Sequence, residues 1–116
     1  MKLVVAGCRD YNDYDRTKKI LDQFYNKFKN DLIILSGGAK GTDSLGERYA
    51  KENNLQLQVF PANWTRYGKK AGPIRNEQMA KACNAVLAFW DGKSKGTRSM
   101  LKLAKKYNKK IYIIKI

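Results

Sequence analysis

Three glycines stand within five positions, directly behind a short apolar run at residues 32–35 and directly before a helical pattern. Glycines let a backbone turn tightly and approach a ligand closely. A helix that begins there points unpaired N–H groups and a positive dipole end over the turn, which suits a phosphate, and Lys40 adds a full charge. An ordinary strand-to-helix turn is the alternative. We predict an anion site, with the ligand contacts Ser36, Gly37, Gly38, Ala39, Lys40, Gly41, Thr42 and Asp43.

The sequence excludes two familiar glycine-rich nucleotide-binding motifs. The pattern Gly-x-x-x-x-Gly-Lys-Ser/Thr of P-loop nucleotidases does not occur. The pattern Gly-x-Gly-x-x-Gly of dinucleotide-binding dehydrogenases is also missing, because Ala39 stands where the second glycine belongs. A phosphate-binding turn remains, without a standard nucleotidase or dehydrogenase motif.

Two further turns carry small and polar residues behind apolar runs. Gly7, Arg9 and Asp10 follow the run at residues 2–6, and another small-residue turn follows the run at residues 85–89 and precedes a helical pattern. The contacts predicted from this last turn are Trp90, Asp91, Gly92, Ser94, Gly96 and Thr97. Two helix N-termini that face one crevice suit two phosphates, as in a pyrophosphate or a bis-phosphorylated nucleotide.

Arg75 and Asn76 stand at the start of another predicted helix, from which both side chains can reach the same crevice. Arginine forks onto phosphate, and asparagine pairs with a base or ribose edge. The sequence leaves open an alternative for Arg75, which is a surface ion pair with Glu77 or Asp91.

Three aromatic side chains, Trp64, Tyr67 and Trp90, are candidates for stacking on a base, although each also suits packing that closes a loop. Trp90 is the strongest candidate, because it directly ends an apolar run at the crevice. Cys8 is not expected to act as a nucleophile, because the chain has no histidine to activate it and a buried thiol is the usual outcome.

The elements that must position these residues alternate along the chain. Short apolar runs predict strands at residues 2–6, 32–35, 55–60, 85–89 and 111–114. Helical spacing predicts helices from Asp13 or Asp15 to about residue 29, from the glycine turn to about residue 54, from residue 72, and over residues 97–107. Strands joined by helical crossovers are parallel, so the fold class is a doubly wound α/β sheet with helices on both faces. Ligands bind such sheets beyond the carboxyl ends of the strands, where these turns lie.

Length and composition bound the function. The 116 residues suit one domain, 1–116, and the two cysteines form no C-x-x-C pair, so we expect reduced thiols in a cytoplasmic protein. The lack of histidine excludes His-based triads and leaves little for a zinc site, so neither a metal nor a cofactor is expected. No apolar run is long enough to span a membrane. The net charge of +14 predicts anionic partners, although a lysine-coated face is most often only solvated.

Four motifs resemble, in order, those of the small single-domain SLOG proteins. They are residues 7–10 (Gly-Cys-Arg-Asp), 36–43 (Ser-Gly-Gly-Ala-Lys-Gly-Thr-Asp), 71–76 (Ala-Gly-Pro-Ile-Arg-Asn) and 88–92 (Ala-Phe-Trp-Asp-Gly). SLOG proteins belong to the Rossmann-like superfamily that includes LOG phosphoribohydrolases and the DNA-processing protein Smf. The resemblance implies one Rossmann-like domain with a five-stranded parallel sheet in the order 3-2-1-4-5, and a nucleotide-related ligand in the crevice.

One departure from the LOG pattern bears on catalysis. LOG enzymes read Gly-Gly-x-Gly-Thr-x-x-Glu, and this glutamate acts in cleavage of the base–ribose bond, but Leu45 holds its position here. Glu47 lies two residues further on, about 200° around the helix, and is expected to face elsewhere. Asp43 is the only carboxylate left in the motif. The pattern Ser-Gly-Gly-Ala-x-Gly-x-Asp resembles the Smf-like motif, which serves in ligand binding. The resemblance therefore favours a binding protein over an enzyme.

Three functions are compatible with these residues. The first is binding of a nucleotide-derived signal, either of the ADP-ribose type or a cyclic nucleotide. The protein would act as a sensor of this signal or as a sponge that sequesters it, and a phage-encoded protein fits the second role. SLOG domains sense such signals in prokaryotic immune systems. The second is a nucleotide N-glycosidase that uses Asp43 or Asp10, and the third is single-stranded nucleic-acid binding through the net charge and Trp64, Tyr67 and Trp90. We also expect a homodimer, because the site is shallow for one small domain and SLOG proteins commonly associate through helices.

Overall fold

The five apolar runs form one all-parallel sheet in the order β3-β2-β1-β4-β5, in a computed structural model that describes all residues 1–116. The predicted fold class and strand order are confirmed. The strands are β1 (Lys2–Gly7), β2 (Ile33–Ser36), β3 (Gln56–Val59), β4 (Ala85–Trp90) and β5 (Lys110–Lys115). The register places Leu3 of β1 opposite Ile34 of β2 and Ala85 of β4, so β1 is the central strand.

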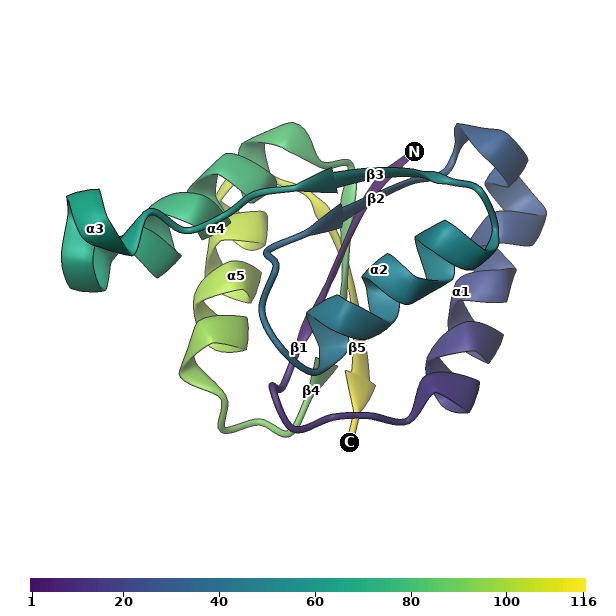
Figure 1. The fold of residues 1–116 in the computed structure, drawn as a ribbon, viewed down its shortest axis with the longest axis horizontal. Coiled ribbons are helices and arrows are strands. Elements are labelled where there is room, and N and C mark those ends of the chain that lie inside the picture. The colour runs from purple at the N-terminus through teal and green to yellow at the C-terminus, as the bar shows by residue number, and fades with distance from the viewer.

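Helices cover both faces of this sheet (Figure 1). On one face α1 (Tyr14–Phe28) packs beside α2 (Thr42–Glu52), and on the other α4 (Ala71–Ala82) packs beside α5 (Lys95–Lys106). Each helix is the crossover between two parallel strands, which explains why helices lie on both sides. None of these helices has both the length and the apolar character needed to cross a membrane.

Alternation along β1 divides the core into two layers, because successive side chains point to opposite faces of a strand. Leu3 and Val5 pack in one cluster with residues of α1 and α2, whereas Val4 and Ala6 pack in another with residues of α4 and α5. Residues 85–89 of β4 are fully inaccessible on both faces. Burial on both faces is why this strand reads as a continuous apolar run.

The start of α1 agrees with one of its two predicted caps. The Asp13 carboxylate accepts a hydrogen bond from the Arg16 N–H at 3.1 Å, which satisfies one of the unpaired donors at the helix start. Leu21 is fully buried, and Phe24 and Phe28 pack against the same core cluster while remaining partly exposed. This apolar face holds α1 on the sheet.

Residues 62–71, where the sequence predicted no element, contain a short helix, α3 (Trp64–Tyr67), and a 3₁₀ turn (Gly68–Lys70). The Asn63 side chain caps α3 by accepting a hydrogen bond from the Arg66 N–H at 3.0 Å. α3 projects from the body of the molecule beyond the end of β3 (Figure 1). Asn63 is the sequence signal for this helix, but so few residues cannot display a helical period.

Candidate functional site

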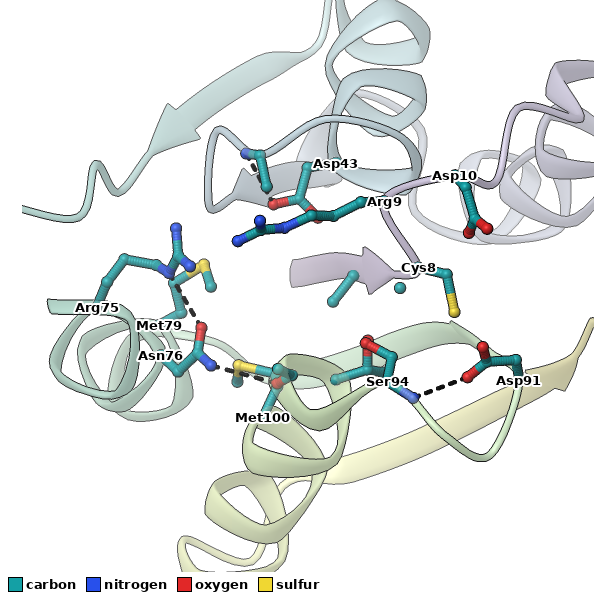
Figure 2. Close-up of a pocket in the computed structure, with 15 residues that line it drawn as sticks. Cys8, Arg9, Asp10, Asp43, Arg75, Asn76, Met79, Asp91, Ser94 and Met100 are labelled. Atoms are coloured by element: carbon teal, nitrogen blue, oxygen red, sulfur yellow. Dashed lines mark hydrogen bonds between the residues drawn. The ribbon is translucent and has the colours of Figure 1, made fainter. Parts of the chain in front are cut away.

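A cavity of about 310 Å³ opens at the carboxyl ends of β1 and β4, where residues of α2, α4 and α5 meet (Figure 2). We call this cavity the inner hollow. Its floor is apolar, because Ala6, Met79 and Met100 reach it from the core. The residues predicted from the sequence that line it are Gly7, Arg9, Asp10, Ala39, Asp43, Arg75, Asn76, Asp91, Ser94, Gly96 and Thr97.

A second cavity of about 320 Å³, which we call the outer hollow, lies beside the first, toward β3 and α3. Its lining consists of Gly37, Gly38, Val59, Pro61, Ala62 and Trp64, together with Arg9, Ala39 and Arg75. The last three residues also line the inner hollow. Two arginines therefore stand at the divide between the hollows.

The glycine turn before α2 supplies its own hydrogen-bond acceptors. The Gly38 N–H donates to Ser36 Oγ at 3.0 Å, and the Ala39 N–H donates to Asp43 Oδ2 at 3.2 Å. The Thr42 N–H, the first of the helix, donates to a backbone carbonyl of the β1–α1 loop at 3.2 Å. The prediction of unpaired N–H groups over this turn is therefore wrong for these three, whereas the N–H groups of residues 43 and 44 donate to no acceptor in the chain.

Four predicted contacts at this turn line neither hollow, namely Ser36, Lys40, Gly41 and Thr42. Thr42 is fully buried, and its Oγ1 donates to the Cys8 carbonyl at 3.0 Å. Gly41 has a φ of +75°, and a Cβ there would overlap the carbonyl groups of Cys8 and Arg9. The turn thus holds the β1–α1 loop in place, and with it the backbone that carries Arg9.

Asp43 is 8% exposed, and its environment perturbs its ionisation. Burial raises the pKa of its carboxyl, while the Ala39 N–H and the charge of Arg75 act in the opposite direction. The charge of Glu47 raises this pKa further. Glu47 Oε2 accepts a hydrogen bond from Ser36 Oγ at 2.6 Å. The expectation that Glu47 faces elsewhere is therefore wrong, because it lies one helical turn beyond Asp43 on the same side of α2.

Arg75 has only neutral hydrogen-bond partners. Its Nη1 donates to the Gly37 carbonyl, and its Nε donates to Asn76 Oδ1 at 3.0 Å. The alternative of a surface ion pair is wrong, because no carboxylate lies within ion-pair distance of Arg75. Asn76 Nδ2 in turn donates to the Gly96 carbonyl at 3.4 Å, which connects α4 to the start of α5.

Arg9 is exposed, and it takes part in none of the ion pairs of the structure. Figure 2 shows its guanidinium extended toward that of Arg75. Burial lowers the pKa of Arg75, and the charge of Arg9 also lowers it, although Asp43 acts in the opposite direction. Two cations this close, neither of them in an ion pair, suit an anion between them.

The turn before α5 is arranged differently from the turn before α2. Asp91 Oδ1 accepts hydrogen bonds from the N–H groups of Lys93 at 2.8 Å and Ser94 at 2.9 Å, which lower the pKa of Asp91. The N–H groups of residues 95–97, the first of α5 itself, donate to no acceptor in the chain. A Cβ on Gly96 would meet no atom within 4 Å, so the space at this helix start is open.

The three aromatic candidates lie in different places. Trp90 donates from Nε1 to the Ser94 carbonyl at 3.1 Å, and with Gly92 it lines a separate cavity beside β5. The expectation that Trp90 is the strongest stacking candidate in the crevice is therefore wrong, because its side chain packs against the α4 and α5 side of the core. Trp64 instead lines the outer hollow and is 54% exposed, whereas Tyr67 lines neither hollow.

Cys8 lines the inner hollow, with its sulfur directed toward Asp91 (Figure 2). Burial raises the pKa of its thiol, which keeps the sulfur protonated and unreactive. The sequence pointed to Trp64 but not to Val59, Pro61 and Ala62, which line the outer hollow with it. The strand order could have indicated these residues, because β3 pairs with β2 and the residues that follow the two strands therefore lie close together. No group of three His, Cys, Asp or Glu side chains is placed to hold a metal ion.

Two DNA processing proteins share this fold. DprA from Streptococcus pneumoniae matches with a TM-score of 0.77 and 20% identity, over 97% of this chain and 49% of that one. DprA from Helicobacter pylori, whose structure was described for its single-stranded DNA binding mode, matches with a TM-score of 0.75 and 19% identity, over 97% of this chain and 64% of that one. The chain thus spans about half of the first protein and less than two thirds of the second.

Sequence comparison identifies the family as well as the fold. The Gene 61 protein of Mycobacterium phage D29 is 31% identical over 111 residues, which are 90% of this chain and 89% of that protein. The model of a SLOG family matches residues 1–67, which contain the glycine turn and the β1–α1 loop. The chain belongs to the YspA, cpYpsA-related SLOG family.

Proposed function

We propose that this protein binds a nucleotide-derived ligand across the mouth of the inner hollow, with a phosphate at Arg9 and Arg75, and holds it without cleaving it. The pair of arginines is the observation that carries the proposal. Arg9 takes part in no ion pair, and Arg75 donates only to the neutral oxygens of Gly37 and Asn76. A phosphate supplies the negative oxygens that these planar, forked donors bind most strongly.

The chemistry of the inner hollow supports a nucleoside there in place of the two phosphates expected from the sequence. Three carboxylates, those of Asp10, Asp43 and Asp91, line it and repel anions. Carboxylate and amide oxygens accept hydrogen bonds from ribose hydroxyls and from base N–H groups. The unpaired N–H groups at the start of α5 can donate to oxygens of the same ligand.

Holding without cleavage is supported by the carboxylates near the glycine turn. Leu45, at the LOG glutamate position, is half-buried and lines neither hollow. Asp43 already accepts a hydrogen bond from the Ala39 N–H, and Glu47 from Ser36. Neither carboxylate is left unpartnered as an acid–base group, which disfavours the N-glycosidase alternative with Asp43.

The role that fits such binding is sensing or sequestering a signal of the ADP-ribose or cyclic nucleotide type. The Gene 61 protein, 31% identical to this chain, belongs to a mycobacteriophage, and this origin supports the sequestering role. A viral protein that holds a host signal withdraws it from the host response. Turnover is not needed for that effect, because the ligand is removed by mass action.

A second candidate, single-stranded nucleic-acid binding, is favoured by the surroundings of Trp64. This side chain is exposed beside Arg9 and Arg75, and exposed aromatics beside cations are the usual platform for single strands. The net charge of +14 and the fold shared with Helicobacter pylori DprA point the same way. Binding through the charge should weaken steeply with salt, and a small ligand held by few phosphates should not.

Calorimetry with AMP and ADP-ribose tests the proposal. We expect both to bind, and Arg9→Ala to weaken each about tenfold, as for a charge-assisted hydrogen bond. Lys19→Ala, the same charge change on an exposed residue of α1 outside both hollows, should leave the affinity unchanged. The ligand recovered after denaturation should be intact. Recovery of free base would establish the glycosidase instead. If neither AMP nor ADP-ribose binds, the proposed function is wrong.

The assembly that we propose is a homodimer. Residues of the edge strand β5 and the residue after it expose apolar surface, namely Tyr112, Ile113 and Ile116. A second copy would cover this apolar surface, although the exposed Lys110 and Lys115 at the two ends of β5 would have to stay at the rim of the interface. Sedimentation at micromolar concentration should give twice 13.3 kDa, and a single 13.3 kDa species would contradict the dimer.

A further inference from the structure

The two hollows meet at a charged divide. Of the residues that line each, they share only Arg9, Ala39 and Arg75. Figure 2 shows the two guanidinium groups approaching one another from the β1–α1 loop and from α4. Volumes of about 310 and 320 Å³ put each hollow near the lower end of ligand pockets, which is about 300 Å³. Each hollow alone is therefore small, and cationic groups connect them.

The two hollows differ in chemistry. The inner hollow has a polar rim of carboxylates, Asn76 and hydroxyls, which suits the hydrogen-bonding edges of a nucleoside. The outer hollow has an apolar wall that includes Val59, which is 46% exposed, and Trp64. Such a wall offers a planar partner and little hydrogen bonding, which suits the face of a base.

Trp64 is held in place although it is exposed. Its α3 helix is capped by Asn63, and a Cβ added to Gly72 would lie 3.4 Å from the Cη2 atom of the indole. The ring therefore lies over the first turn of α4, close to its backbone. A side chain fixed in this way loses little freedom when a base stacks on it.

We propose that the ligand contains two nucleoside units joined through phosphate, with the linkage between Arg9 and Arg75, one nucleoside in the inner hollow and the second base on Trp64. This inference rests on the proposed function of the inner hollow and extends it to the outer one. A mononucleotide leaves the outer hollow empty, whereas a linked pair fills both hollows and places its anion where the two cations meet.

The chemistry has two sources, a small dinucleotide and a nucleic-acid strand, and both contain the same unit. Energetically, the anion offsets the repulsion between the arginines, and the second base adds a stacking contact. Both contributions come without ordering a new segment of the chain. The linked ligand should therefore bind more tightly than its half.

Calorimetry with AMP and the linear dinucleoside monophosphate ApA tests this inference. We expect ApA to bind about tenfold more tightly than AMP, and Trp64→Ala to bring that ratio close to one. Tyr67→Ala is the matched control, because Tyr67 is an exposed aromatic on the same helix that lines neither hollow. It should leave the ratio unchanged.

The outcomes separate the inference from the function on which it rests. If AMP binds and ApA binds no more tightly, or if Trp64→Ala leaves the ratio unchanged, the two-hollow ligand is wrong and the inner-hollow function stands. If neither AMP nor ApA binds, both are wrong. Cyclic di-AMP and the strand dA₁₂ then identify the source, because only a strand gains further affinity with length and loses it steeply with salt.

Discussion

The residues that begin α2 and those that begin α5 form two turns at the same edge of the sheet, each with small residues before a helix. At α2 acceptors within the chain take the N–H groups of Gly38 and Ala39, through the side chains of Ser36 and Asp43, although the N–H groups of residues 43 and 44 donate to none. At α5 the side chain of Asp91 reaches only the N–H groups of residues 93 and 94, and those of residues 95–97 stay unpaired.

The difference lies in where the acidic residue stands. Asp43 is in the first turn of its helix and folds back over the glycines, whereas Asp91 precedes its helix and closes the loop before it. A helix N-terminus is open to an outside anion only where its own side chains do not reach. The side chain of Asp43 therefore covers part of the glycine-rich turn, which also holds Arg9 and Arg75 in place, whereas no side chain accepts from the first three N–H groups of α5.

The largest expected effect is on the glycine-rich turn, in the variant Gly41→Ala. Gly41 has a φ of +75°, and the new Cβ would overlap the carbonyl groups of Cys8 and Arg9. Strain and overpacking together should lower the free energy of unfolding by about 2–5 kcal/mol, measured by urea denaturation. The control is Gly92→Ala, near the start of α5, where φ is +82° but a Cβ meets nothing within 4 Å. Equal losses in both variants would contradict a tightly packed α2 turn.

The next effect concerns the two acidic residues. Asp43→Ala removes a buried carboxylate and the acceptor of the part-buried Ala39 N–H, and should lower the free energy of unfolding by about 1–3 kcal/mol. Asp91→Ala should cost less, because water can replace its carboxylate at the exposed N–H groups of Lys93 and Ser94. Thermal and urea unfolding measure both variants. A larger loss of unfolding free energy for Asp91→Ala than for Asp43→Ala would contradict the view that Asp43 is the more important of the two for the stability of its turn.

The pH dependence of the same two residues should have opposite signs. The folded-state pKa of Asp43 is raised, mainly by burial, so its contribution to stability is present below its usual pKa of 3.8 and is lost as pH rises through the folded value. The pKa of Asp91 is lowered by backbone N–H groups, so its contribution is present above 3.8 and is lost as pH falls through the folded value.

The measurement is the difference in unfolding free energy between the parent and each Asn variant, from pH 7 downward. For Asp43→Asn the difference should grow as pH falls toward 3.8, and for Asp91→Asn it should shrink below 3.8. Parallel curves would mean that burial does not dominate at Asp43.

The sequence predicted the fold well, because its signals are local and strong there. Apolar runs and the Asp13 cap are short-range features, and the strand order came with the SLOG resemblance. The prediction that Arg75 and Asn76 reach the crevice rests on a general rule for helix starts at the carboxyl edge of a parallel sheet, and both residues line the inner hollow. The wrong predictions for Glu47 and Trp90 could have been avoided from spacing alone. Glu47 is four residues after Asp43 and shares its face, and Trp90 shares the face of Ala88.

The remaining errors concern contacts that no pattern records. Whether Asp43 folds back onto the Ala39 N–H depends on its rotamer and on the space that Gly37 leaves, where a Cβ would lie 2.9 Å from Asp43 Oδ2. The outer hollow depends on α3, whose few residues carry no period, and on β3 lying beside β2. Tertiary neighbours decide both features, so the sequence gives residue types there without their arrangement.

The smallest expected effect on stability separates the glycines of the two turns as ligand contacts. Gly96→Ala places a methyl group in open space at the start of α5 and should change the free energy of unfolding by less than about 1 kcal/mol, while it weakens AMP binding by crowding the unpaired N–H groups. Gly38→Ala should do the reverse. Its φ of +74° costs about 1 kcal/mol in stability, but its N–H is already held by Ser36, so AMP affinity should not change. Urea denaturation and calorimetry on both variants decide the matter. If Gly38→Ala weakens AMP binding and Gly96→Ala does not, the glycine-rich turn contacts the ligand and the start of α5 does not.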